Sequence, residues 1–221
     1  MLITRGRRTY SRPHLYNSST TYLARGRFLG GDPRGKVVVV LTGTGGNGGG
    51  AMVCARRLHN YGADVRVYVT SVEKMTSVPA HQLDILRRMG VSVAEADAIT
   101  TQSAPDLVVD GVIGYSLKGD PYGAAGDLIR WANAVDAPVL SLDAPSGVDT
   151  TTGTVFAPAV QATATMTLAL PKEGLRAEGV EAQVGELYLA DISVPPELYS
   201  APALGLSVGP IFAQGDIVRI R

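Results

Sequence analysis

The sequence lacks several features that would point to whole classes of protein. A single cysteine among 221 residues excludes an internal disulfide and fits a reducing compartment. No apolar run approaches the ~20 residues that a membrane-spanning helix needs. Twenty basic and twenty acidic residues cancel, so no net charge attracts nucleic acid or an anionic membrane surface. We therefore expect a cytoplasmic protein that binds neither nucleic acid nor membranes.

The three histidines are also dispersed, and no cluster typical of a transition-metal site is present. They are His14, His59 and His81. Apolar side chains, by contrast, make up 45 % of the residues, which is enough for one α/β domain with a sizeable core. The composition thus predicts a globular protein whose ligands are recognised by local groups.

The first 35 residues carry an excess of basic side chains. The arginines that precede the first acidic residue, Asp32, are Arg5, Arg7, Arg8, Arg12, Arg25 and Arg27. Such a segment suits a transit-type leader, a basic arm for an acidic partner or a solvated edge, and all three alternatives stay open. We predict a basic, partly helical segment over residues 1–35, followed by a Rossmann-type domain over residues 36–221.

The chain is organised around residues 36–58, where an apolar run leads into a glycine loop and then a helix. Val37–Leu41 is continuously apolar, which is typical of a strand covered on both faces of a parallel sheet. Six of the eight residues in Gly43–Gly50 are glycine, more than a tight turn needs. An amphipathic helix follows, with apolar residues at Ala51, Cys54, Ala55 and Leu58. Its bare N-terminal N–H groups would suit an anion or phosphate.

The glycine loop allows more than one interpretation. Gly43, Gly45 and Gly48 match the G-x-G-x-x-G dinucleotide fingerprint. The next strand, however, ends without the acidic residue that would hold a ribose. A P-loop is excluded because no Gly-Lys-Ser/Thr follows. A glycine turn that only lets helix and sheet pack together stays open.

Strands and helices alternate along the rest of the chain. The patterns predict strands over 64–70, 91–94, 106–109, 138–142, 162–170, 186–190 and 217–220, and helices over 77–89 and 121–133. This alternation predicts a Rossmann-like three-layer α/β fold with a mostly parallel central sheet. In such sheets ligands bind at the carboxyl ends of the strands, where the glycine loop, Asp110 and Asp143 should converge.

Hard oxygen donors occur in the segments that should converge. Asn47, Asp110 and Ser146 would suit an alkali or alkaline-earth cation better than a transition metal. Asp110 and Asp143 could each instead cap its own turn. Lys118 follows the Asp110 strand; beside a polyanion it would be a phosphate anchor or a proton donor, and otherwise a solvated surface charge.

Three motifs, in this order and spacing, resemble the NAD(P)H-hydrate epimerase family, the YjeF N-terminal domain. They are TGTGGNGGGAMVCARRLHNYGADVRVY, DGVIGYSLKGD and DAPSGVDTTTG, and the resemblance continues through TATMTLALPKEGL to about Pro195. It implies a Rossmann-like fold and a homodimer. The implied activity is interconversion of the R and S forms of hydrated NADH or NADPH at C6, a repair of damaged nicotinamide nucleotides.

Carried over by position, the resemblance also implies particular site residues. A potassium ion would be bound by Asn47, Asp110 and Ser146. Substrate contacts would come from Asp143 and from two loops, namely Gly46, Asn47, Gly48, Gly49, Gly50, Gly114, Tyr115, Ser116, Leu117, Lys118, Gly119 and Asp120. Asp143 and Lys118 would exchange protons as the 6-hydroxyl leaves and returns.

Two loop positions depart from the family pattern Gly-Asn-Asn-Gly-Gly-Asp-Gly. Gly46 replaces the first asparagine and Gly50 replaces the aspartate, so two polar side chains are missing. A second function therefore stays open beside the epimerase, a non-catalytic nucleotide-binding or interaction module on the same fold. The presence of Asp110, Lys118 and Asp143 favours the enzyme, because a scaffold needs no such set at one end of a sheet.

Overall fold

The computed structural model describes residues 16–100 and 104–221, with side chains of the first helix from Ser19 onward. The described residues contain one eight-stranded sheet. Its strands are β1 Val37–Thr42, β2 Asp64–Val69, β3 Ser92–Glu95, β4 Leu107–Gly111, β5 Val139–Leu142, β6 Ala164–Leu168, β7 Glu186–Ala190 and β8 Ile217–Arg219. They lie in the order β3-β2-β1-β4-β5-β6-β7-β8, all parallel except β8, which pairs antiparallel with β7.

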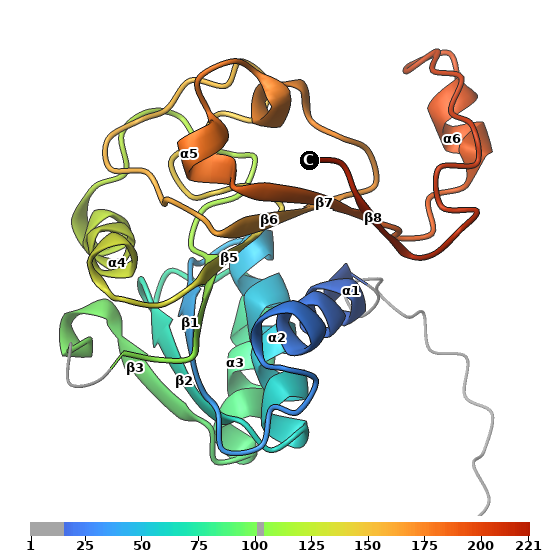
Figure 1. The fold of residues 1–221 in the computed structure, drawn as a ribbon. Coiled ribbons are helices and arrows are strands. Elements are labelled where there is room, and N and C mark those ends of the chain that lie inside the picture. Colours follow the sequence, from blue (N-terminus) through green and yellow to red (C-terminus); the bar gives the residue numbers. More distant parts are fainter. Residues whose placement is uncertain (1–15, 101–103) are drawn as a thin grey trace, which may run out of the picture.

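Helices cover both faces of this sheet. The α-helices are α1 Tyr16–Leu23, α2 Gly46–Asn60, α3 Ser77–Arg88, α4 Gly123–Ala134, α5 Glu181–Val184 and α6 Pro196–Ser200; η2 Ala24–Phe28 is a π-helical turn, and η3 Ala96–Ala98 and η4 Glu173–Arg176 are 3-10 turns. α1, α2 and α3 lie on one face, and α4 and α5 lie on the other (Figure 1). The predicted three-layer α/β fold with a mostly parallel sheet is confirmed.

Strand β1 shows why its sequence is apolar throughout. Val38 and Val40 pack with the core on the side of α1, α2 and α3, whereas Val39 and Leu41 pack with the core on the side of α4. Because alternate side chains of a strand point to opposite faces, a strand covered on both sides needs an apolar residue at every position.

Helix α2 presents the predicted apolar stripe to the sheet. Ala51, Cys54, Ala55 and Leu58 are completely buried. Burial raises the pKa of the Cys54 thiol to about 11, so that it remains protonated and unreactive at neutral pH. The interpretation of Cys54 as a small core residue is confirmed.

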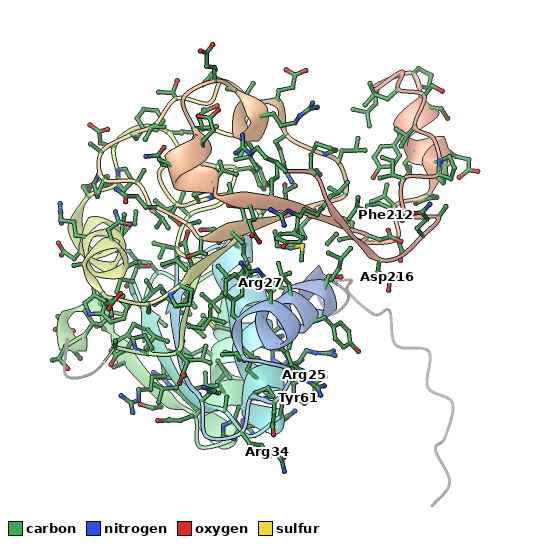
Figure 2. The ribbon with its side chains drawn as sticks, in the orientation of Figure 1. Arg25, Arg27, Arg34, Tyr61, Phe212 and Asp216 are labelled. Carbon is green, nitrogen blue, oxygen red and sulfur yellow. The ribbon has the colours of Figure 1, made fainter. Side chains whose placement is uncertain are left out.

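The described part of the basic N-terminal segment packs against the domain. α1 contacts α2 and β7. Arg27 of η2 pairs with Glu186 at the start of β7, with 3.2 Å between Nη2 and Oε1. Arg25 lies over the ring of Tyr61, 5.4 Å from its centroid (Figure 2). These arginines anchor the N-terminal helix; Arg5, Arg7, Arg8 and Arg12 lie outside the described residues.

The C-terminal residues make an excursion before they complete the sheet. The chain leaves β7 at Ala190, forms α6 away from the other helices, and returns as the edge strand β8 (Figure 1). None of the helices in the part of the chain that the structure describes has the length and hydrophobicity to cross a bilayer.

The order of the strands determines where a ligand can bind. β1 lies between β2 and β4, and the chain continues from β1 to β2 on one side before it returns to form β4 on the other. The carboxyl ends of β1 and β4 therefore form the point at which the strand order reverses. A crevice is expected there in an open parallel sheet.

Candidate active site

Helix α2 begins directly in the glycine loop after β1. Gly45 is its N-cap, and no side chain caps the first turn, which also contains no acidic residue. The first N–H groups of a helix have no partner within the helix, and they carry the positive end of its dipole. The loop thus presents bare N–H groups at the carboxyl end of the sheet.

The glycines of this loop serve two different purposes. A side chain at Gly48 would collide with the carbonyl oxygen of Gly43, so Gly48 is needed for the close approach of helix and strand. A side chain at Gly46 would meet nothing within 4 Å. The packing interpretation therefore explains Gly48, whereas Gly46 borders open space that a ligand can enter.

A cavity of about 680 Å³ opens at this point, a volume that suits a small-molecule ligand. The predicted substrate residues that line it are Gly46, Asn47, Gly48, Gly50, Gly114, Tyr115, Ser116 and Asp143. The predicted residues outside its lining are Gly49, Leu117, Lys118, Gly119 and Asp120. Sequence reasoning had not included Thr20 of α1 or Thr44, Thr76 and Val78, which also line it.

The loop that follows β4 divides into two parts. Gly114, Tyr115 and Ser116 border the cavity, and Tyr115 is 80 % exposed at its edge. Lys118 is exposed beyond them. Asp120 accepts a hydrogen bond from the backbone N–H of Ala157 at 3.0 Å, so its carboxylate fixes the far end of the loop.

Asp110 is a completely buried carboxylate at the carboxyl end of β4. Its Oδ1 accepts hydrogen bonds from the Ser146 hydroxyl and from Val112 N, and its Oδ2 accepts them from the Ser141 hydroxyl and from Ser146 N. Burial raises the pKa of Asp110 above its ordinary value, and the hydrogen bonds from Ser146, Ser141 and Val112 oppose that rise. No ion pair among the described residues involves Asp110.

Asn47 and Ser146 bring further oxygens to the same end of the sheet as Asp110. The Ser146 hydroxyl accepts a hydrogen bond from Ile113 N at 2.8 Å while it donates to Asp110 at 2.6 Å. Asn47 lies against Gly114, and its Nδ2 donates to the carbonyl oxygen of Leu142 at 3.2 Å, which leaves its own oxygen available. The three predicted cation ligands thus converge from α2, β4 and the turn after β5.

This donor set fits a hard alkali or alkaline-earth cation. The Asp110 carboxylate is buried with neutral hydrogen-bond donors as its partners and no cationic side chain, so a negative charge there remains costly in the protein interior. Carboxylate, amide and hydroxyl oxygens are ligands for hard cations rather than for soft transition metals. Within residues 16–100 and 104–221, no group of three or more His, Cys, Asp or Glu suited to a metal occurs.

Asp143 occupies the end of β5 in an uncommon backbone conformation. Its φ is 63°, in the left-handed region that few residues other than glycine adopt. The backbone is held there by a hydrogen bond from Asp143 N to the carbonyl oxygen of Met166 at 2.7 Å. Left-handed residues often mark functional sites, and Asp143 lines the cavity.

The structure also brings a lysine to Asp143, a pairing that sequence reasoning missed. Lys172, in the turn after β6, pairs through its Nζ with Oδ1 of Asp143 and also donates to the carbonyl oxygen of Leu168 at 3.1 Å. The Pro-Lys-Glu-Gly turn was part of the family resemblance. Nothing in the sequence, however, indicates that its lysine meets an aspartate 29 positions earlier.

Comparisons with known proteins identify the family of the chain. The chain matches YjeF-related proteins at their N-terminus over residues 15–174. It is 39 % identical over 193 residues to an NAD(P)H-hydrate epimerase of Dehalogenimonas lykanthroporepellens, with 87 % of this chain and 76 % of the relative covered. It is 35 % identical over 159 residues to an NAD(P)H-hydrate epimerase of Levilactobacillus brevis, with 71 % and 73 % covered.

Other relatives are longer proteins. A bifunctional NAD(P)H-hydrate repair enzyme of Salinibacter ruber is 35 % identical over 176 residues, which cover 73 % of this chain but only 32 % of the relative. The crystal structure of yeast ynu0, YNL200c, superposes with a TM-score of 0.77 at 22 % identity, over 97 % of this chain and 91 % of the yeast chain. At that identity the likeness establishes the fold.

Proposed function

Since the chain belongs to the family of YjeF-related N-terminal domains, we propose that it is an NAD(P)H-hydrate epimerase, which interconverts the R and S forms of hydrated NADH or NADPH at C6. One observation in the structure carries the proposal. Asp143, an aspartate at the end of a central strand, lines a cavity that also borders the bare N-terminus of α2. One site thus offers both N–H groups that can bind an anionic dinucleotide and a carboxylate that can transfer a proton.

The substrate would be held mainly by the backbone. Its pyrophosphate is an anion, and the N–H groups at the start of α2 provide a site for such a group without any positive side chain. Gly46 leaves the wall open where the family pattern has asparagine, so the phosphates can approach the backbone closely. Tyr115, at the cavity edge, offers an aromatic surface to a planar ring of the substrate.

The reaction requires two proton transfers, one before and one after its cationic intermediate. When the C6–O bond breaks, the 6-hydroxyl takes a proton and leaves as water, and the ring nitrogen forms a double bond to C6. Water then adds to the opposite face of C6 and loses one proton, which gives the other epimer. Asp143 can exchange a proton with the oxygen at C6, and its charge stabilises the cationic intermediate; each such contribution is typically worth ~10² to 10⁴ in rate.

We also propose that a potassium ion is bound by Asn47, Asp110 and Ser146. The burial of Asp110 without a cationic partner and the convergence of three oxygen donors support this proposal. A bound cation would balance that charge beside the substrate. The three ligands belong to α2, β4 and the turn after β5, and both the start of α2 and the residues that follow β4 line the cavity.

A single purified epimer of the hydrate tests the proposed function. With the protein present, we expect the other epimer to accumulate until both reach their equilibrium ratio, as followed by chromatography. A parallel sample without protein measures the uncatalysed rate. If the two samples change at the same rate, the alternative of a non-catalytic nucleotide-binding module replaces the epimerase.

A further inference from the structure

The carboxylate of Asp143 is held asymmetrically. Its Oδ1 accepts from Lys172 Nζ and lies 3.5 Å from the Thr167 hydroxyl. The described residues give its Oδ2 no hydrogen-bond partner. One oxygen is thus fixed by the protein, and the other is left for a ligand in the cavity that Asp143 lines.

Lys172 is itself held in place, so that it can orient Asp143. Its Nζ donates to the carbonyl oxygen of Leu168 at 3.1 Å as well as to Asp143. Leu168 borders the cavity, whereas Lys172 does not. Only 23 % of the Lys172 side chain and 14 % of the Asp143 side chain are exposed. Lys172 therefore contacts the carboxylate from outside the cavity lining, where it does not meet the ligand.

Stability alone does not account for this pair. Exposed ion pairs contribute little to folding, and partly buried pairs lose in desolvation much of what they gain in attraction. Lys172 instead pairs with an aspartate whose backbone already has a strained, left-handed φ of 63°. Both features restrict one side chain at the edge of the cavity.

We propose that Lys172 is the positioning residue of Asp143, holding Oδ1 so that Oδ2 is free to exchange a proton with the oxygen at C6. This inference rests on the proposed epimerase function. Precise placement of a catalytic group matters because a misplacement of about 1 Å can reduce a rate on the order of 10²-fold. Lys172 thereby has a role in turnover, although it does not touch the substrate.

The test compares variants of two lysine–aspartate pairs. Lys172→Met removes the ammonium and keeps the apolar stem; we expect kcat to fall on the order of 10²-fold with KM changed less than about twofold. Lys36 pairs with Asp106 at 2.9 Å, at the amino ends of β1 and β4 and so at the opposite edge of the sheet. Lys36→Met is therefore the matched control, and it should leave both constants unchanged.

Rescue separates positioning from a general structural role. Lys172→Arg, which retains a cation, should recover part of kcat. Lys172→Ala should recover turnover when ethylammonium is added and should not respond to ethanol, because only the cation can bind Oδ1. The proposal is overturned if neither Lys172→Arg nor added ethylammonium restores turnover, or if Lys172→Met has the wild-type kcat. The Arg variant and chemical rescue keep the test decisive even where the Met variant does not fold.

Crystal structures give a readout that does not depend on turnover. In Lys172→Met or Lys172→Ala we expect the Asp143 carboxylate to leave its wild-type orientation, whereas Lys36→Met should preserve it. An unchanged Asp143 overturns the proposal. A wild-type protein without epimerisation overturns the proposed function instead, and the orientation of Asp143 then still decides whether Lys172 positions it.

Discussion

Ser146 binds both carboxylate oxygens of Asp110, through its hydroxyl at 2.6 Å and through its backbone N–H at 2.9 Å. These bonds join the turn after β5 to the carboxyl end of β4. Asp110 is fully buried, so the junction depends on a charge that no described cationic side chain balances. The first prediction concerns that charge.

Asp110→Asn should lower stability and remove the response to potassium. The amide keeps the shape of the carboxylate, but its NH₂ group would face hydroxyl or N–H donors, and each buried group left unsatisfied costs about 1–3 kcal/mol. Thermal unfolding in potassium chloride and in tetramethylammonium chloride at equal ionic strength measures both effects. We expect potassium to raise the wild-type Tm, because a ligand of the folded state stabilises it, and to leave the variant unaffected. Equal responses of the two proteins would contradict the proposed potassium site.

Asp143→Asn should separate folding from catalysis. The substitution keeps the size of the side chain and removes the charge that proton exchange requires. We expect a variant that folds, still binds a nicotinamide nucleotide, and epimerises roughly 10² or more times slower. Circular dichroism, nucleotide titration and the epimerisation rate together measure this. Wild-type turnover in the folded variant would reduce Asp143 to a residue of its turn.

Lys118→Ala distinguishes two roles for the lysine of the loop after β4. Its place in the motif suggested proton transfer, but its exposed position outside the cavity lining favours a contact with the substrate phosphates. We therefore expect KM to rise several-fold and kcat to stay within about twofold. Steady-state kinetics on the hydrate decide the matter, since a kcat lowered on the order of 10² would assign the proton transfer to Lys118.

Glu186→Gln tests how the N-terminal helix is attached. A hydrogen bond from Arg27 lowers the pKa of Glu186 below its ordinary value, and a hydrogen bond from Tyr188 makes a smaller contribution in the same direction. An acid with a lowered folded-state pKa stabilises the fold above its unfolded pKa, and this stability is lost as the pH falls through the folded pKa. We expect the variant to have a lower Tm than wild type at pH 7, with a difference that shrinks as the pH falls below about 4.5, the ordinary value. A difference that does not depend on pH would contradict the pairing with Arg27.

Local patterns were sufficient to predict most of the fold. The continuous apolar run of β1 reflects a strand that is covered by helices on both faces of the sheet. The buried stripe of α2 reflects a helix that packs against the sheet through one face. Boundaries were less predictable, because the pattern that predicted a strand over 162–170 is longer than the strand it contains, Ala164–Leu168. The short helices α5 and α6 were missed, since segments of four or five residues are too short to show helical periodicity.

The site could be predicted only where a general rule places residues together. Asn47, Asp110 and Ser146 converge because the carboxyl ends of parallel strands meet at one edge of the sheet. The pairing of Lys172 with Asp143 depends on how the turn after β6 folds back, and no periodicity encodes that. For the same reason the sequence did not indicate that Lys118 lies outside the cavity lining.

Catalysed epimerisation at C6 is tested most directly by coupling the protein to a dehydratase that accepts one epimer only. A mixture of R and S hydrates is treated with excess dehydratase, and the recovery of reduced nicotinamide is followed by absorbance. With dehydratase alone, rapid recovery should stop when the accepted epimer is consumed. With wild-type protein we expect rapid recovery of the entire pool, and with Asp143→Asn we expect the time course of dehydratase alone. A wild-type time course that stops at the same level as dehydratase alone would contradict epimerase activity.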